Sequence, residues 1–191
     1  APTETPTAVP TEVPTMALTV SPLAPEGFPE LPRIDGVRFA THAAGVRYTT
    51  GRTDVMLAEM APGTTLAGVF TRSSTRGAPV LDCEAKLAAL EPGEGDGVAI
   101  IVNSGNANAF TGARGQEAVR DVTGAVAERL GIPAGRVFSS STGVIGEPLR
   151  AERIVAALDT LVGKLSADAV EEAARAIMTT DTFPKGSTAT A

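Results

Sequence analysis

The chain has 191 residues, of which 43% are hydrophobic, and it carries a net charge of −6 with a pI near 4.9. This size and composition suffice for a substantial hydrophobic core. Nucleic-acid binding is not expected, because phosphate recognition needs clustered basic residues and the lysines and arginines are scattered along the chain. No segment approaches the roughly 18 consecutive apolar residues of a membrane span, so no membrane contact is expected either.

The single cysteine, Cys83, and the single histidine, His42, limit the available chemistry. One cysteine cannot form an intramolecular disulfide, and the N-terminus lacks the pattern of a secretory or transit signal, so the sequence predicts a cytoplasmic protein. A zinc site or a Cys–His nucleophile pair would have almost no ligands to use. We therefore expect no metal and no cofactor, and a structural role for Cys83.

Two regions differ sharply in composition. Residues 1–33 are rich in proline and threonine, which predicts an extended, mobile N-terminal arm because proline removes backbone donors and little of the segment can be buried. Residues 34–191 contain all the apolar periodic segments, so they are expected to form the folded domain.

The elements expected in this domain alternate between short strands and helices. Apolar, β-branched runs predict strands at 37–40, 54–58, 65–71, 97–102 and 136–139. Helical spacing predicts a helix at 118–130, a second after Pro148 with an inward stripe from Ile154 to Leu165, and a third that begins at Ser166 as N-cap and runs out at Met178. Gly131 and Pro133 provide a stop signal for the first helix. Strands followed by mixed strands and helices indicate an α/β domain, an α+β layered sandwich.

Two polar segments follow predicted strands. Residues 103–112, NSGNANAFTG, are either an ordered strand-to-helix crossover or the wall of a polar pocket at the carboxyl end of a strand. Residues 139–146, SSSTGVIG, could supply a serine nucleophile, but no suitable base is near in sequence. The remaining interpretations are an oxyanion hole, formed by a threonine hydroxyl and a glycine N–H, or a plain polar strand end.

Taken together, six segments make the sequence resemble the ornithine acetyltransferases, the bifunctional glutamate N-acetyltransferases of arginine biosynthesis. The segments are AAGV at 43–46, GVFT at 68–71, APV at 78–80, NSGNANA at 103–109, STGVIG at 141–146 and AIMTTD at 176–181. They occur in the family's order from about residue 35 to the end of the chain. The resemblance implies the layered fold of self-cleaving N-terminal-nucleophile enzymes.

The family's enzymes are made as a precursor that cuts itself at an Ala-Thr bond, so the resemblance implies that this chain is an α chain. The nucleophile, the new N-terminal threonine of the β chain, is not in this chain. Thr142 and Gly143 match the family's oxyanion pair, and Thr179 matches its substrate-contacting threonine. The implied reaction transfers acetyl from N-acetylornithine to glutamate in two ping-pong steps. Whether acetyl-CoA is a second donor is left open.

The resemblance also implies a β-chain partner, with α2β2 assembly. The family's Lys-Gly-x-Gly-Met cleavage segment is not present in residues 1–191, so we expect this chain alone to be inactive. Three alternatives remain from the sequence. The chain could belong to a related N-terminal-nucleophile amidohydrolase or aminopeptidase, to an acyltransferase of a secondary pathway, or to a non-catalytic, truncated module.

Overall fold

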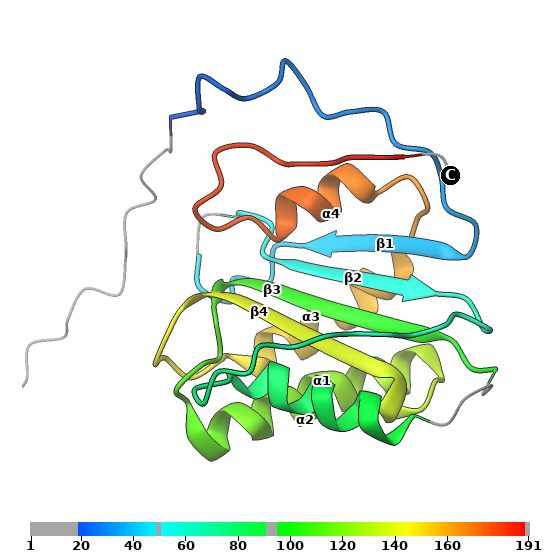
Figure 1. Cartoon of the computed structure of the whole chain (residues 1–191), viewed down its shortest axis with the longest axis vertical. Helices are drawn as coiled ribbons and strands as arrows, with labels where there is room; N and C mark the ends of the chain where they lie inside the picture. The colour runs from blue at the N-terminus through cyan, green and yellow to red at the C-terminus, as the bar shows by residue number, and fades with distance from the viewer. Residues whose placement is uncertain (1–18, 49–50, 91–94, 190–191) are drawn as a thin grey trace, which may run out of the picture.

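The computed structural model describes residues 19–48, 51–90 and 95–189 (Figure 1). The four strands and the helices occur in a mixed order along this part of the chain. They are β1 (Val37–His42), β2 (Val55–Met60), α1 (Ala78–Ala89), β3 (Val98–Asn106), α2 (Gly112–Leu130), the short 3-10 turn Ala134–Arg136, β4 (Val137–Val144), α3 (Ala151–Gly163) and α4 (Val170–Ala176). The predicted α/β layered class is confirmed.

The strands form one sheet in the order β1-β2-β3-β4. The first two pairs are antiparallel, and β3 and β4 are parallel, with Ala99 opposite Val137. A parallel pair needs a long crossover, which α2 provides. As a result β1, β3 and β4 all end at the same edge of the sheet, on the left in Figure 1. We call this edge the carboxyl edge.

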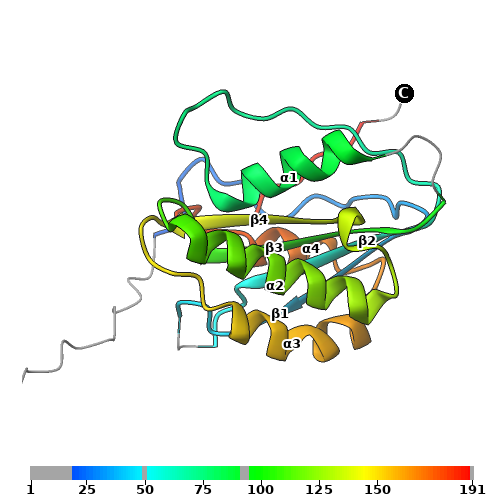
Figure 2. The ribbon, with the colours of Figure 1, turned by 90° about the horizontal axis from the view of Figure 1, so that it is seen from below.

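Helices α2 and α3 cover one face of the sheet (Figure 2). Their apolar stripes, including Val126 and Leu158, pack against inward-facing strand residues such as Leu57 and Ile101. Gly131 ends α2 in the left-handed conformation, with φ 67°, as the predicted stop signal requires. This face carries the largest cluster of buried residues and forms the main core.

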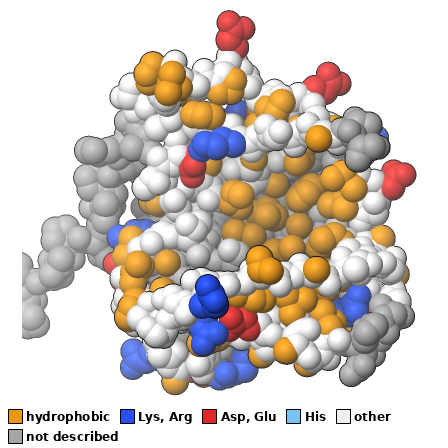
Figure 3. All heavy atoms as spheres, viewed as in Figure 1, with side chains coloured by type: hydrophobic (Ala, Val, Ile, Leu, Met, Phe, Trp, Pro, Cys, Tyr) orange, Lys and Arg blue, Asp and Glu red, His pale blue; other side chains and the backbone are white. Residues whose placement is uncertain are grey.

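The opposite face is only partly covered. Helix α4 packs over β1 and β2, with Ala173 and Ala176 against Met56 and Ala58. Helix α1, which begins with Pro79 in its first turn, packs against the sheet through Cys83 next to Phe138. Between these two coverings lies a recess of hydrophobic side chains, visible near the centre of Figure 3. We call this recess the open apolar face.

The prediction of a strand at 65–71 is wrong. The structure describes this segment in full, and it crosses α1 as an irregular strap. Leu66 and Phe70 are partly buried against the cluster that contains Cys83 and Phe138, without strand pairing, whereas Val69 is almost fully exposed. Gly68 lies so close to α1 that an added Cβ would be 2.8 Å from Leu87 Cδ1.

The last predicted helix starts later than expected. The sequence predicts Ser166 as its N-cap, but Ser166 forms a two-bond bridge with Phe39 on the outer side of β1, with N–O distances of 2.8 and 2.9 Å. Pairing with β1 keeps Ser166 extended, so α4 begins only at Val170. The strand predicted at 136–139 is also longer, because the ladder with β3 continues to Val144.

Residues 19–33 have no helix or strand and lie beside the C-terminal segment. Ser21 donates its N–H to Thr182 Oγ1 at 3.2 Å, and Arg33 pairs with Asp168. Residues 1–18 lie outside the described residues, so the mobility of the arm stays a prediction. In the described part of the chain, no helix combines the length and the apolar character needed to cross a membrane.

Candidate active site

The two polar segments of the sequence lie side by side at the carboxyl edge. The first part of each segment, residues 103–106 and 139–144, extends the parallel β3–β4 ladder, and the remainder follows the strands as the sequence predicts. Ser104 is opposite Thr142, and Gly105 is opposite Gly143. The strands continue here because both segments can pair through their backbones, whatever their side chains.

Gly143 has a backbone conformation that only glycine adopts readily, with φ 134°. An added Cβ would lie 2.3 Å from the carbonyl carbon of Gly105, so a side chain has no room. Thr142 is half-buried and Gly143 is exposed. The Thr142 hydroxyl and the Gly143 N–H therefore lie next to each other at the end of a strand. A pair of donors of this kind can stabilise an oxyanion.

The asparagines of β3 hold the ends of the two parallel strands together. Ser141 donates its hydroxyl to Asn103 Oδ1 at 2.7 Å, and Asn103 Nδ2 donates to the carbonyl of Asn106 at 2.9 Å. Asn106 Nδ2 donates in turn to the carbonyl of Glu147 at 3.0 Å, beyond β4. These amide groups are engaged within the chain, which favours a structural role for them at the edge of the site.

The segment after α4 reaches the same edge. Ser104 Oγ donates to the carbonyl of Ala176 at 2.8 Å, and Arg52 donates to the carbonyl of Met178. The Arg52 guanidinium also lies 4.6 Å from the centre of the Tyr48 ring. Because Ser104 is the ladder partner of Thr142, these contacts place the Thr179 segment at the strand ends that carry Thr142 and Gly143. The three predicted site residues therefore lie at one edge.

Sequence reasoning missed Asp54, which is fully buried at the start of β2. Its carboxylate accepts the N–H groups of Ala44 at 2.7 Å and Val46 at 2.6 Å. Burial raises the pKa of this carboxyl, while the backbone donors act in the opposite direction. The sequence shows an aspartate just before an apolar strand, which is a hint of a buried carboxylate. It does not reveal which loop that carboxylate would hold.

A cavity of about 570 Å³ adjoins these residues, beneath the strap and α1. Its walls are mainly apolar, and Ser140 and Ser141 contribute hydroxyl-bearing residues at the side toward Thr142. Cys83 lies in the wall, donates to the carbonyl of Ser139 at 3.3 Å, and has its thiol pKa raised by burial. A buried thiol with a raised pKa is a poor nucleophile, in agreement with a structural role.

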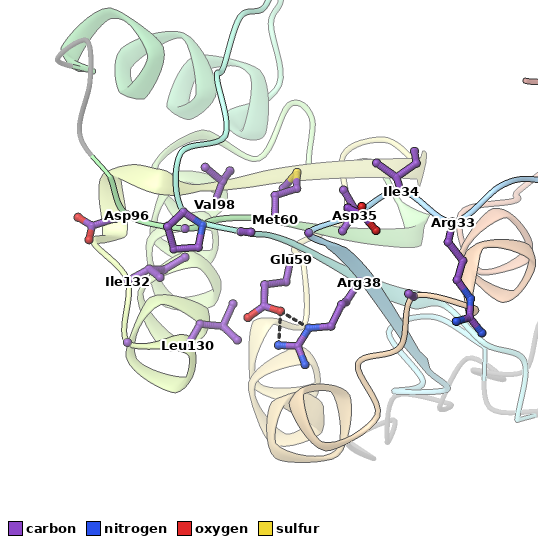
Figure 4. Close-up of a pocket in the computed structure, with 17 residues that line it drawn as sticks. Arg33, Ile34, Asp35, Arg38, Glu59, Met60, Asp96, Val98, Leu130 and Ile132 are labelled. Atoms are coloured by element: carbon purple, nitrogen blue, oxygen red, sulfur yellow. Dashed lines mark hydrogen bonds and ion pairs between the residues drawn. The ribbon is translucent and has the colours of Figure 1, made fainter. Parts of the chain in front are cut away.

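A second cavity, of about 700 Å³, lies at the opposite edge of the sheet (Figure 4). The ion-paired Arg38 and Glu59 line it, and Leu130 and Ile132 also form part of its wall. It contains none of the residues predicted for the site. Among residues 19–48, 51–90 and 95–189, no group of three or more metal-ligating side chains is arranged to hold a metal ion.

The fold and the carboxyl edge define a class: a layered α/β chain with a threonine-glycine donor pair at the end of a parallel strand. Residues 38–191 match the model of the ArgJ family. The arginine biosynthesis bifunctional protein ArgJ of Ruegeria pomeroyi is 66% identical over 171 residues, and that of Nitrobacter winogradskyi is 52% identical over 174 residues. The chain therefore belongs to the ArgJ family.

The matched regions cover 90% and 91% of this chain but only 41% of each relative, so the chain spans about two fifths of the curated relatives' length. Two solved structures share the fold. An ornithine acetyltransferase from Mycobacterium tuberculosis, complexed with ornithine, is 36% identical with a TM-score of 0.71, over 78% of this chain and 79% of that chain. ArgJ from Bacillus halodurans is 32% identical with a TM-score of 0.67, over 78% and 74% of the two chains.

Proposed function

We propose that this chain is the α chain of an ornithine acetyltransferase and supplies the oxyanion hole of the enzyme. Its partner is a β chain from the same precursor, whose N-terminal threonine is the nucleophile, in an α2β2 assembly. The substrates are N-acetylornithine and glutamate. Membership of the ArgJ family and the likeness to the ornithine acetyltransferase from M. tuberculosis support this assignment.

The proposed reaction has two acyl-transfer steps. The threonine hydroxyl attacks the acetyl carbonyl of N-acetylornithine, the C–N bond breaks, and ornithine leaves with the proton that the hydroxyl lost. The α-amino group of glutamate then attacks the acetyl-threonine, releasing N-acetylglutamate and restoring the threonine hydroxyl. Each step passes through a tetrahedral oxyanion, which the Thr142 hydroxyl and the Gly143 N–H stabilise. Thr179 contacts the substrate.

The observation that carries the proposal is the packing of Gly143 against Gly105. With φ 134° and no space for a Cβ, Gly143 leaves its backbone accessible beside the Thr142 side chain. A strand that only ended in polar residues would not need a glycine in such close contact. An oxyanion hole does need an unhindered N–H at a fixed position next to a second donor.

The open apolar face supports the proposed β-chain partner. Several hydrophobic side chains on it are only partly buried by α1, α4 and the strap; they are Phe39, Met60, Leu66, Phe70, Ile100 and Val102 (Figure 3). Contiguous exposed apolar surface of this kind is typical of an interface. The relatives have more than half of their length beyond the matched region, which provides a chain to cover it.

The test is an acetyl-exchange assay on the protein expressed from the whole reading frame that encodes these residues. Incubation with N-acetylornithine and glutamate should yield ornithine and N-acetylglutamate in equal amounts. Intact-mass measurement should show a second chain and, after brief incubation with N-acetylornithine alone, an acetyl group on it. Hydrolysis of a peptide amide without acetyl exchange would support an aminopeptidase-like relative instead.

A further inference from the structure

Asp54 buries a carboxylate that contacts only backbone donors of the described chain. Oδ1 lies 2.7 Å from Ala44 N and Oδ2 lies 2.6 Å from Val46 N, and the side chain is fully buried. N–H groups converging on an anion form a nest. Here the anion belongs to the chain itself, so the nest fixes the loop at residues 43–48, which we call the clamp loop.

The backbone of Asp54 joins the same region to the sheet. Its N–H donates to the carbonyl of His42, at the end of β1, with an N–O distance of 3.2 Å. Its carbonyl accepts the N–H of Ser104, in β3, at 2.9 Å. Asp54 therefore ties β1 and the clamp loop to the residue that is opposite Thr142 in the β3–β4 ladder.

The far end of the clamp loop packs against Gly105, the glycine that contacts Gly143. A Cβ on Gly105 would lie 2.9 Å from Arg47 Cβ and 3.1 Å from the Tyr48 ring. Gly105 in turn touches Gly143. Arg47 also pairs with Glu147, three residues after the end of β4, so the loop contacts β3 and the segment that follows β4.

We propose that Asp54 is a positioning residue: its carboxylate holds the clamp loop against Gly105, and the loop thereby fixes the Thr142–Gly143 donor pair. The inference rests on the proposed acetyltransferase function. A carboxylate suits the position because both of its oxygens accept from the loop. An asparagine of the same shape would turn an NH₂ group toward one of the backbone donors and release that side of the loop.

The test compares Asp54→Asn, Thr142→Ala and the double variant in the enzyme expressed from the whole reading frame. For Asp54→Asn we expect kcat to fall about 10- to 10²-fold, the scale of a roughly 1 Å displacement of catalytic groups, with little change in the KM for N-acetylornithine. Because Asp54 acts through the donor pair, and Thr142→Ala already removes one of the two donors, the two effects should be less than additive in the double variant. Asp121→Asn, an exposed position in α2, is the matched control and should keep its full kcat.

A second variant covers the case in which Asp54→Asn does not fold. Arg153, in α3, donates to the carbonyl of Gly45 and so holds the clamp loop from the other side. Arg153→Met should also lower kcat with little change in the KM for N-acetylornithine, but by a smaller factor than Asp54→Asn. Additive effects of Asp54→Asn and Thr142→Ala would overturn the proposal, as would a folded Arg153→Met enzyme with unchanged kcat.

Amide hydrogen exchange separates this proposal from the proposed function. If the unmodified enzyme shows no acetyl exchange, the acetyltransferase assignment fails, whatever Asp54 does. Whether Asp54 holds the clamp loop is then tested by amide hydrogen exchange at Ala44 and Val46. The exchange rates of these two amides should be at least tenfold higher in Asp54→Asn than in Asp121→Asn. Unchanged exchange at both amides would overturn the role of Asp54 in holding the loop.

Discussion

Gly143 is a residue at which the fold accepts only glycine. Its φ of 134° and its contact with Gly105 each exclude a side chain. The neighbouring Thr142 is constrained differently, since β4 fixes its backbone while its hydroxyl remains partly accessible. The strand thus provides one donor from the main chain and one from a side chain, and only the second can be removed without disturbing the ladder.

Thr142→Ala is therefore the direct test of the oxyanion hole. Removing the hydroxyl should lower kcat about 10²- to 10³-fold, as with other oxyanion donors, while Thr142→Ser should retain most of the activity. Steady-state kinetics with N-acetylornithine and glutamate measure both variants, and circular dichroism checks their folding. A Thr142→Ala enzyme with near wild-type kcat would contradict the proposed role.

At the scale of elements, the sequence predicted best where periodicity and local stop signals agree. The helix predicted at 118–130 is present as α2 and ends at Leu130, because a long apolar stripe meets a glycine that can adopt positive φ. The buried strand at 97–102 is likewise confirmed as part of β3. The strap at 65–71 has the composition of a strand, but only Leu66 and Phe70 are partly buried, and they pack near α1 instead of pairing with a strand, which the local pattern cannot reveal.

The candidate site was predictable only in part, because a local sequence pattern does not reveal contacts between distant segments. Thr142, Gly143 and Thr179 were found through a family motif, and the structure brings their segments to one edge through Ser104 and the β3–β4 ladder. Asp54 lies about ten residues from the amides that it holds, and its interaction depends on the turn between β1 and β2. No spacing rule links a buried carboxylate to such a loop.

Lys86 of helix α1 contacts α2 and β4, so replacing it tests how α1 is attached to the rest of the domain. Lys86 Nζ donates to Thr123 Oγ1 at 3.1 Å and to the carbonyl of Val137 at 2.8 Å, in α2 and β4. It also pairs with Asp82 Oδ2 at 2.7 Å, without hydrogen-bond alignment. One ammonium group thus links three elements in a largely buried position.

Lys86→Met should lower the free energy of unfolding by about 2 kcal/mol, because it leaves Asp82 and the Val137 carbonyl without their cationic partner. Calorimetry measures the shift, and adding Asp82→Asn should recover part of the loss. Lys164→Met, at an exposed position just after α3, is the control and should change stability little. Equal melting temperatures for Lys86→Met and the control would contradict this account of α1.

At the scale of the whole molecule, the two faces of the sheet differ in how completely helices cover them. One face is closed by α2 and α3, whereas the open apolar face lies between α1, the strap and α4. Val102 of β3 is only partly buried there. If the second chain of the proposed enzyme packs on this face, the apolar surface is the interface between the two chains.

Val102→Asp tests this arrangement, because burying an uncompensated carboxylate at the interface costs several kcal/mol. We expect the second chain to dissociate from the variant during size-exclusion chromatography and acetyl exchange to be lost, while the circular dichroism of the remaining chain is retained. Ala156→Asp introduces the same charge at an exposed position on α3, on the closed side of the sheet, and should leave the assembly intact. If the Val102→Asp chain folds and still elutes with its partner, the open apolar face is not the surface on which the second chain packs.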